Sequence, residues 1–255
     1  MYNIQPNTLF TGKLIKYLST CHSTNDIAVQ MIQSENTVFE GTVIITDNQT
    51  AGRGQRGNSW EANTGENLTF SLILKPYFLK ASDQFQLNVA VSMGVLDFLS
   101  EFIDENLKVK WSNDIYFGDK KMGGILIENS LKGYHIGQSI IGIGLNINQI
   151  EFSNERATSL RKITQNPLKY DLPNLLSKLL ENIEKNYLKI KNNVYESLKN
   201  RYLSNLFRFE EYHYFRRNGQ QFLGKIIGID ETGKLGIETD GNLIYFDFKE
   251  VEFVL

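Results

Sequence analysis

A short segment of this 255-residue chain combines three glycines with two arginines. Residues 52–57 read Gly-Arg-Gly-Gln-Arg-Gly, with Arg53 and Arg56 between the glycines, and Trp60 follows soon after. Glycines let a backbone approach a ligand closely, arginines pair with carboxylate or phosphate oxygens, and an aromatic ring can cover an apolar or base-like ring. These residues predict a loop that binds an anionic ligand, and a solvated surface hairpin loop is the alternative.

The same residues fit the Gly-x-Gly-x-x-Gly fingerprint of dinucleotide-binding proteins. That fingerprint needs a helix that begins at the third glycine, because the pyrophosphate lies on the helix N-terminus. Here residues 58–66 have a loop composition and lead into another predicted strand, and the chain contains no Walker A sequence. We therefore reject a Rossmann-type or P-loop nucleotide site.

A second group of charged residues lies near the middle of the chain. Residues 110–114 read Lys-Trp-Ser-Asn-Asp, and residues 120–128 read Lys-Lys-Met-Gly-Gly-Ile-Leu-Ile-Glu. Strict strand alternation places Lys121, Gly123 and Ile125 on one face. Adjacent glycines weaken a strand, which indicates that something packs directly against the backbone there. The alternative is a charged hairpin turn with a β-bulge.

A third segment, residues 141–148, alternates between branched apolar residues and small or polar ones. One face of this strand is predicted to be core, and the other carries only glycine and asparagine. A buried face without side chains leaves a cavity unless a ligand fills it, whereas an exposed one is simply a weak strand. The sequence does not decide between these two possibilities.

Alternating strands and amphipathic helices surround these segments, which indicates an α/β or α+β domain. The predicted strands are residues 12–18, 42–47, 68–74 (half-buried, by alternation), 108–117, 122–129 and 134–148. The predicted helices are residues 23–33, which open with a capping box, and about 85–103 and 172–190.

The pattern changes near residue 209, where helical periodicity stops. Asn-Gly, Thr-Gly and Asp-Gly pairs at 218–219, 232–233 and 240–241 then separate short β runs, as is typical of hairpins. We expect residues 1–208 to form the main domain and residues 209–255 a small all-β barrel or meander. At this size the second unit must dock on the first to be stable.

Composition excludes several classes of function. The 27 Lys+Arg against 29 Asp+Glu give a net charge of −2, which argues against a protein that works mainly on nucleic acid or an anionic membrane surface. One cysteine and three scattered histidines offer no disulfide and no Cys-based metal site. Residues 1–16 lack a signal-peptide pattern and no apolar run could cross a bilayer, so we expect a cytoplasmic protein.

Together and in this order, the three segments resemble the biotin protein ligases, which attach biotin to a lysine of carboxylase carrier domains. The matching stretches span some 125 residues and are 23–25, 49–60, 110–114, 121–126 and 142–146. The resemblance implies the α+β fold class, with a catalytic domain like that of class II aminoacyl-tRNA synthetases, a mixed sheet flanked by helices. The β-rich C-terminus is similar to the family's small SH3-like β-barrel domain.

The resemblance also implies two half-reactions. The biotin carboxylate first attacks the α-phosphate of ATP to give biotinyl-5′-AMP and pyrophosphate, with Mg²⁺ offsetting phosphate charge. A lysine of the biotin carboxyl carrier domain then attacks the mixed anhydride, and AMP leaves. The implied substrates are ATP and biotin, and no protein metal site is expected.

The family pattern assigns roles to individual residues. The residues implied to bind biotin are Ser23, Thr24, Asn25, Gln49, Gly52, Arg53, Gly54, Gln55, Lys121, Gly123 and Gly124. Those implied to bind ATP or the adenylate are Arg53, Arg56, Trp60, Asn113, Lys121 and Asn146. The implied catalytic residues are Lys121, Arg53 and Asp114, of which Lys121 reaches both the biotin carbonyl region and the α-phosphate and Asp114 orients or helps to deprotonate the incoming amine.

Three residues depart from the family pattern. Gln55 stands where many relatives have arginine, Asn58 where a basic residue often follows the third glycine, and Ser112 where proline is common. Fewer cations in the loop imply weaker retention of the adenylate.

Some ligases of this family are also repressors with an N-terminal winged helix-turn-helix domain. Only 22 residues precede Ser23, fewer than the roughly 50 that a separate domain needs, so we expect a monofunctional enzyme that binds no operator. We also expect a monomer or a weak homodimer, which the sequence does not distinguish.

Two other functions remain open at this stage. A lipoate or other acyl ligase of the same superfamily shares the adenylation chemistry and a catalytic lysine, but Gly-Arg-Gly-x-Arg-Gly with Lys-Trp-x-Asn-Asp favours biotin. A non-catalytic ligand sensor would use the loop to hold a small anion and the C-terminal barrel to bind a partner. Nucleic-acid binding is a distant third.

Overall fold

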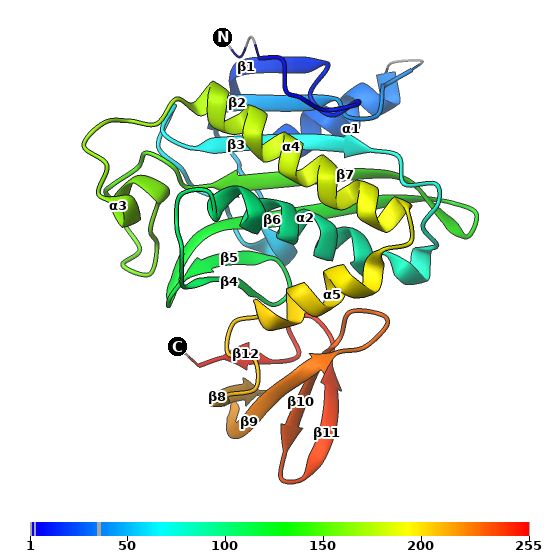
Figure 1. The fold of residues 1–255 in the computed structure, drawn as a ribbon, viewed down its shortest axis with the longest axis vertical. Helices are drawn as coiled ribbons and strands as arrows, with labels where there is room; N and C mark the ends of the chain where they lie inside the picture. Colours follow the sequence, from blue (N-terminus) through cyan, green and yellow to red (C-terminus); the bar gives the residue numbers. More distant parts are fainter. Residues whose placement is uncertain (1, 3, 35–36, 255) are drawn as a thin grey trace.

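A seven-stranded mixed sheet forms the centre of the protein (Figure 1). The computed structural model of the chain describes residues 2, 4–34 and 37–254, apart from the side chain of Arg56. The spatial order of the strands is β1 (Ile15–Cys21), β2 (Val43–Gln49), β3 (Leu68–Leu74), β7 (His135–Leu145), β6 (Lys120–Lys132), β5 (Asp114–Phe117) and β4 (Leu107–Lys110). Only β1 and β2 pair in parallel, because the α1 crossover joins them.

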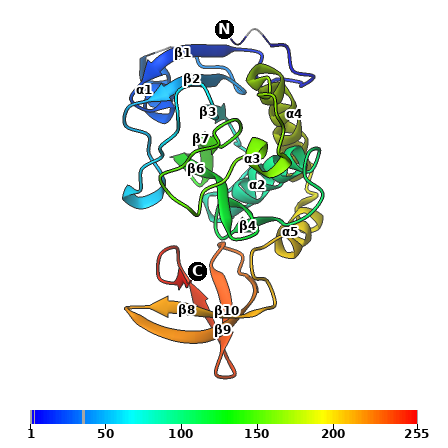
Figure 2. The same ribbon diagram turned by 90° about the vertical axis from the view of Figure 1, so that its left-hand side faces the viewer.

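Helices cover both faces of this sheet. Helix α1 (Thr24–Ser34) lies on one side, and α2 (Phe85–Leu99) and α4 (Leu172–Lys191) lie on the other, as the side view shows (Figure 2). Shorter helices are α3 (Leu160–Thr164), α5 (Tyr195–Ser204) and the 3₁₀ turns η1 (Gln55–Gly57) and η2 (Ala81–Asp83). Among the described residues, none of the helices is both long and apolar enough to cross a membrane.

Strand β3 is buried on both faces, so the prediction of a half-buried strand was wrong. Phe70 and Leu72 belong to the large core that α2 and α4 cover. Ile73 belongs instead to a smaller core with Ala28 of α1. Because helices pack on both sides of β3, alternation of residue types does not correspond to alternation of burial.

Strand β6 has a bulge next to the charged turn, as the alternative interpretation of this segment expected. Ile115 pairs with Gly123, but Tyr116 pairs with Lys121, so Met122 is the extra residue. The bulge moves Lys121 to the face of Gly124, where a Cβ added to Gly124 would lie 3.5 Å from the Lys121 ammonium. The predicted strict alternation, with Lys121 on the face of Gly123, was therefore wrong.

The C-terminal residues form a five-stranded antiparallel sheet. Its order is β11 (Asn242–Phe246), β10 (Leu235–Thr239), β9 (Gln220–Ile229), β8 (Tyr212–Arg217) and β12 (Glu252–Phe253). Turns at Asn218-Gly219 and Asp240-Gly241 join its hairpins, and both residues of each pair have positive φ, as the sequence predicted. The domain boundary after residue 208 stays a prediction.

A tryptophan of the main sheet region fixes this second sheet in place. Trp111 donates from Nε1 to the Gly233 carbonyl at 2.9 Å, and its ring centroid lies 5.7 Å from that of Phe248. Gly233, in turn, packs so closely on Phe85 that an added Cβ would lie 2.3 Å from the ring. The two sheets therefore share one hydrophobic core.

Gly94 marks the closest approach of α2 and α4. A Cβ added there would lie 2.7 Å from the Cα of Ile183 and 3.0 Å from the Asn182 carbonyl oxygen. We expect Gly94→Ala to reduce the free energy of unfolding by about 1–3 kcal/mol, although alanine is by about 1 kcal/mol the better helix former.

The test is urea denaturation beside Gly228→Ala, a half-buried glycine of β9 whose added Cβ meets nothing within 4 Å. The free energy of unfolding of Gly228→Ala should be lower than that of wild type by less than about 0.5 kcal/mol. Equal stability of the two variants would contradict the close helix packing.

Candidate active site

A cavity of about 350 Å³ lies beside the N-terminus of α1, between the glycine-rich loop, β6, β7 and the C-terminal sheet. Most of the predicted site residues line it. These are Ser23, Thr24, Asn25, Gln49, Arg53, Gly54, Gln55, Trp60, Asn113, Asp114, Lys121 and Gly124. Gly52, Gly123 and Asn146 are not in its wall, and the side chain of Arg56 lies outside the described residues.

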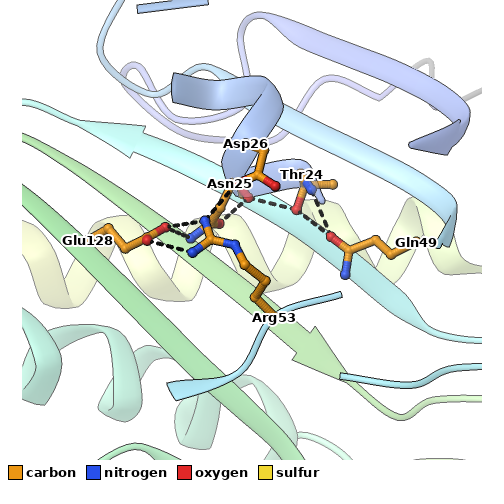
Figure 3. A network of polar contacts seen from close by, with 7 residues as sticks. Thr24, Asn25, Asp26, Gln49, Arg53 and Glu128 are labelled. Carbon is orange, nitrogen blue, oxygen red and sulfur yellow. Dashed lines mark hydrogen bonds and ion pairs between the residues drawn. The ribbon is translucent and has the colours of Figure 1, made fainter. Parts of the chain in front are cut away.

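One end of the cavity is a chain of buried polar groups (Figure 3). Gln49 Oε1 accepts from the backbone N–H of Thr24 at 2.7 Å and from its hydroxyl at 3.2 Å. The Ser71 hydroxyl lies 2.7 Å from the Thr24 hydroxyl and donates to Asn25 Oδ1 at 2.5 Å. Sequence reasoning missed Ser71, because only the sheet brings it below the N-terminus of α1.

Arg53 pairs with two carboxylates of the protein. Its guanidinium donates to both oxygens of Glu128 at 3.0 Å and to Asp26 Oδ1 at 2.8 Å (Figure 3). The hydrogen bonds to Glu128 raise the pKa of Arg53 above its ordinary value. Residue types and spacing did not single out Glu128, which lies beyond the recognised motif on the strand face of Gly124 and Leu126.

The glycine face of β7 is covered by side chains from other elements. A Cβ added to Gly142 would lie 2.5 Å from Asn25 Oδ1, and one added to Gly144 would lie 2.3 Å from the ring of Trp60. This settles the question that the alternating pattern left open, because the face is neither empty nor exposed. Both glycines also line the cavity, so any larger residue there would displace Asn25 or Trp60.

The two predicted glycines outside the wall serve close contacts within the chain. A Cβ added to Gly52 would lie 2.4 Å from the Trp60 carbonyl oxygen, and one added to Gly123 would lie 2.7 Å from the Gly144 carbonyl oxygen. Gly52 therefore lets the glycine-rich loop fold back on itself, and Gly123 lets β6 pack tightly against β7.

Lys121 and Asp114 form an ion pair on the wall opposite α1. Lys121 Nζ lies 2.8 Å from Asp114 Oδ1, and both side chains are partly exposed, at 38% and 31%. Asn113, next to Asp114, instead donates its amide to the Ile125 carbonyl and is buried. The pair thus presents one ammonium and one carboxylate to the same cavity, while Asn113 holds the turn in place.

A second hollow of about 850 Å³ adjoins the first and shares Ser59, Trp60 and Lys121 with it. Asn146 lies here, donating to the Thr158 carbonyl at 3.0 Å. In the part of the chain that the structure describes, Asn146 Oδ1 and Trp60 Nε1 are buried without a hydrogen-bond partner. Both residues also line the hollow.

The C-terminal sheet supplies a further wall that the sequence did not predict. The residues of this segment that line the cavity are Phe248, Lys249, Val251, Glu252 and Phe253. Below it, Lys110 Nζ lies 5.1 Å from the ring centroids of both Tyr116 and Phe253. Burial lowers the pKa of Lys110 from its usual 10.5 to about 8.

Metal-binding side chains are sparse here. Over residues 2, 4–34 and 37–254, no three His, Cys, Asp or Glu side chains are grouped so that they could hold a metal ion. The carboxylates in or beside the cavity wall, Asp26, Asp114, Glu128 and Glu252, are all paired with cations. A Mg²⁺ ion entering with a phosphate ligand would therefore take most of its oxygens from that ligand and from water, as Mg²⁺ often does.

Comparison with known proteins agrees with this geometry. Residues 18–146 match the Biotin/lipoate A/B protein ligase family. The chain is 32% identical over 234 residues to the bifunctional ligase/repressor BirA of Bacillus subtilis, covering 90% of this chain and 70% of that protein. It is 26% identical over 210 residues to the biotin–[acetyl-CoA-carboxylase] ligase of Mycobacterium tuberculosis, covering 81% of this chain and 76% of that one.

Solved structures agree as well. The biotin protein ligase from Aquifex aeolicus in complex with biotin and ATP superposes with a TM-score of 0.78 at 29% identity, covering 95% of this chain and 100% of that one. The mixed sheet flanked by helices, with its C-terminal antiparallel sheet, is thus the biotin protein ligase fold, as predicted. The chain belongs to the Biotin/lipoate A/B protein ligase family, which confirms the family predicted from its three segments.

The lowered pKa of Lys110 predicts a specific dependence of stability on pH. Between about pH 8 and pH 10.5 the unfolded chain binds more protons at this site than the folded one, so stability rises with pH. Below about pH 8 both states are protonated and the penalty is constant. From about pH 7.5 to about pH 10, wild type should gain about 1–3 kcal/mol of unfolding free energy relative to Lys110→Met.

Urea denaturation of both proteins at the two pH values measures this difference. Other titrating groups are common to the two proteins and cancel in the comparison. If the difference in unfolding free energy between wild type and Lys110→Met does not change with pH, the Lys110 ammonium is well solvated in the folded protein.

Proposed function

We propose that this protein is an ATP-dependent ligase that activates biotin as biotinyl-5′-AMP and transfers it to a lysine of a biotin carboxyl carrier domain. The observation that carries the proposal is one cavity with a neutral polar end at Gln49, Thr24 and Asn25 and an ammonium, Lys121, at the other. A neutral ring system with a charged acyl tail matches such a site, because buried polar groups orient the ring and the cation meets the carboxylate.

The adjoining hollow supports a nucleotide next to the acyl group. Trp60 and Lys121 line both spaces, so the ammonium can contact a carboxylate on one side and a phosphate on the other. The unpartnered Asn146 Oδ1 offers an acceptor for an amino group of a base, and the Trp60 ring a surface for stacking. Among the proposed nucleotide contacts, Arg56 rests on the sequence alone.

In the first half-reaction, a carboxylate oxygen bonds to the α-phosphorus of ATP while the bond to the β-phosphate bridge breaks and pyrophosphate leaves. Two anions must meet, so the fixed charge of Lys121 lowers their repulsion. Asp114 holds that ammonium at 2.8 Å and so aims it into the cavity. Mg²⁺ brought with ATP supplies additional positive charge to the phosphates.

In the second half-reaction, the amine of the carrier lysine bonds to the acyl carbon, AMP leaves and the amine loses a proton. Asp114 lies in the cavity wall, where its carboxylate orients that amine. The proposal includes the division into a catalytic domain, 1–208, and an SH3-like domain, 209–255, whose edge closes the cavity. It also includes a cytoplasmic location. It further includes the absence of a repressor role, because the net charge of −2 argues against binding to nucleic acid.

The direct test supplies the protein with ATP, Mg²⁺ and either biotin or lipoate, and follows ATP–pyrophosphate exchange and transfer to a carrier domain. We expect biotin to support both and lipoate neither. Lys121→Ala should lower the exchange rate at least about 100-fold, because it removes the fixed charge that faces the reacting groups.

Lys120→Ala is the matched control, because Lys120 is the exposed neighbour and does not line the cavity. It should stay within about twofold of wild type. Exchange with lipoate alone would make the protein a lipoate ligase, and binding without exchange would make it a ligand sensor.

Gln55 predicts weak retention of the adenylate. It lines the cavity with a buried Oε1 that has no hydrogen-bond partner among the described residues, and it carries no charge. Gln55→Arg should slow release of biotinyl-5′-AMP by about tenfold or more, because one charge-assisted hydrogen bond contributes about 1.5–3 kcal/mol.

A chase of labelled adenylate with unlabelled biotin and ATP measures the release rate. Gln220→Arg adds the same charge at an exposed residue of β9 that does not line the cavity, and it should leave the rate unchanged. Release at the same rate from Gln55→Arg and wild type would show that this position does not control retention.

A further inference from the structure

Glu128 contacts two of the proposed ligand-binding residues from outside the cavity wall. Its Oε2 accepts from Asn25 Nδ2 at 2.6 Å and from Arg53 Nη2 at 3.0 Å, and its Oε1 accepts from Arg53 Nη1 at 3.0 Å (Figure 3). One carboxylate on β6 thus joins the start of α1 to the glycine-rich loop, which lie far apart in the sequence.

Glu128 fixes the orientation of the Asn25 amide. A carboxylate only accepts hydrogen bonds, so the NH₂ group of Asn25 must face Glu128 and its oxygen must face the Ser71 hydroxyl. Gly142 makes room for the amide in this position, since a Cβ there would lie 2.5 Å from the Asn25 oxygen. Without Glu128, the NH₂ group would lose this acceptor.

The same carboxylate also fixes the loop that covers the cavity. Arg53 forms an isolated β-bridge with Ser59, and Trp60 donates its backbone N–H to the Gly52 carbonyl at 2.9 Å. A displacement of Arg53 therefore moves Trp60 away from Gly144. Asp26 holds Arg53 as well, at 2.8 Å, but has no hydrogen bond to Asn25.

We propose that Glu128 is a positioning residue that couples biotin binding to closure of the glycine-rich loop, by holding Asn25 and Arg53 on one carboxylate. The coupling is reciprocal: a ligand that orders Asn25 favours the closed loop, and the closed loop favours the ligand. The ligand named here rests on the proposed function, whereas the coupling of Asn25 to Arg53 rests on contacts alone.

Three substitutions separate the two contacts. Glu128→Gln keeps an acceptor for Asn25 but loses the charge that holds Arg53, Glu128→Ala loses both, and Asp26→Asn weakens only Arg53. Glu101→Ala is the control, because Glu101, which follows α2, likewise accepts from a cation, Lys178, and an amide, Asn182. Both partners lie on α4, and none of the three residues lines the cavity.

Trypsin cleavage after Arg53, followed by mass spectrometry, measures loop opening, and calorimetry measures biotin affinity. We expect all three site variants to be cleaved at least about threefold faster than wild type, consistent with the loss of roughly one charge pair. Biotin affinity should fall about tenfold in Glu128→Ala and less than about threefold in Asp26→Asn. Biotin should slow cleavage of wild type more than that of Glu128→Ala.

Glu101→Ala should match wild type in both measurements. If Glu128→Ala binds biotin as tightly as wild type, or if biotin protects both equally, the coupling is wrong. If wild type binds no biotin at all, the proposed function fails instead. In that case, faster cleavage of Glu128→Ala and Asp26→Asn would still support the role of these carboxylates in holding Arg53 and the loop. Unchanged cleavage would overturn that role.

Discussion

The candidate site depends on the end of the central strand β7, where one face carries only glycine. Gly142 and Gly144 of β7 let Asn25 and Trp60 approach to distances at which even a methyl group would collide. The helix start and the glycine-rich loop can therefore rest directly on the sheet. The cavity forms between them, with polar atoms at one end and a tryptophan ring at the other.

Charge is distributed over this site in pairs. Arg53 is held by Asp26 and Glu128, and Lys121 by Asp114, so these two cations are fixed before any ligand arrives. Fixed charges stabilise developing charge without the cost of reorganisation, which suits a reaction between two anions. The near-neutral total of −2 hides this local arrangement, because it sums the charges of the whole chain.

Sequence reasoning located most of the elements and most of the cavity wall. The glycine-rich loop, the Lys121 turn and the hairpin turns at Asn218-Gly219 and Asp240-Gly241 lie where local residue types require them. It failed where burial depends on distant partners. Strand β3 is buried on both faces because α1 packs on one side and α2 on the other, and a bulge at Met122 reverses the alternation around Lys121.

The sequence by itself determined the family, because residue types at fixed spacing within single segments carry the resemblance. The family match over residues 18–146 confirms it. It also determined the glycines that close contacts require. Only the tertiary structure decided which segments meet: that Ser71 lies under Thr24, that Glu128 joins Asn25 to Arg53, and that β12 closes the cavity over Lys110. Such contacts join residues from different strands and helices, so neither spacing nor periodicity along the chain contains them.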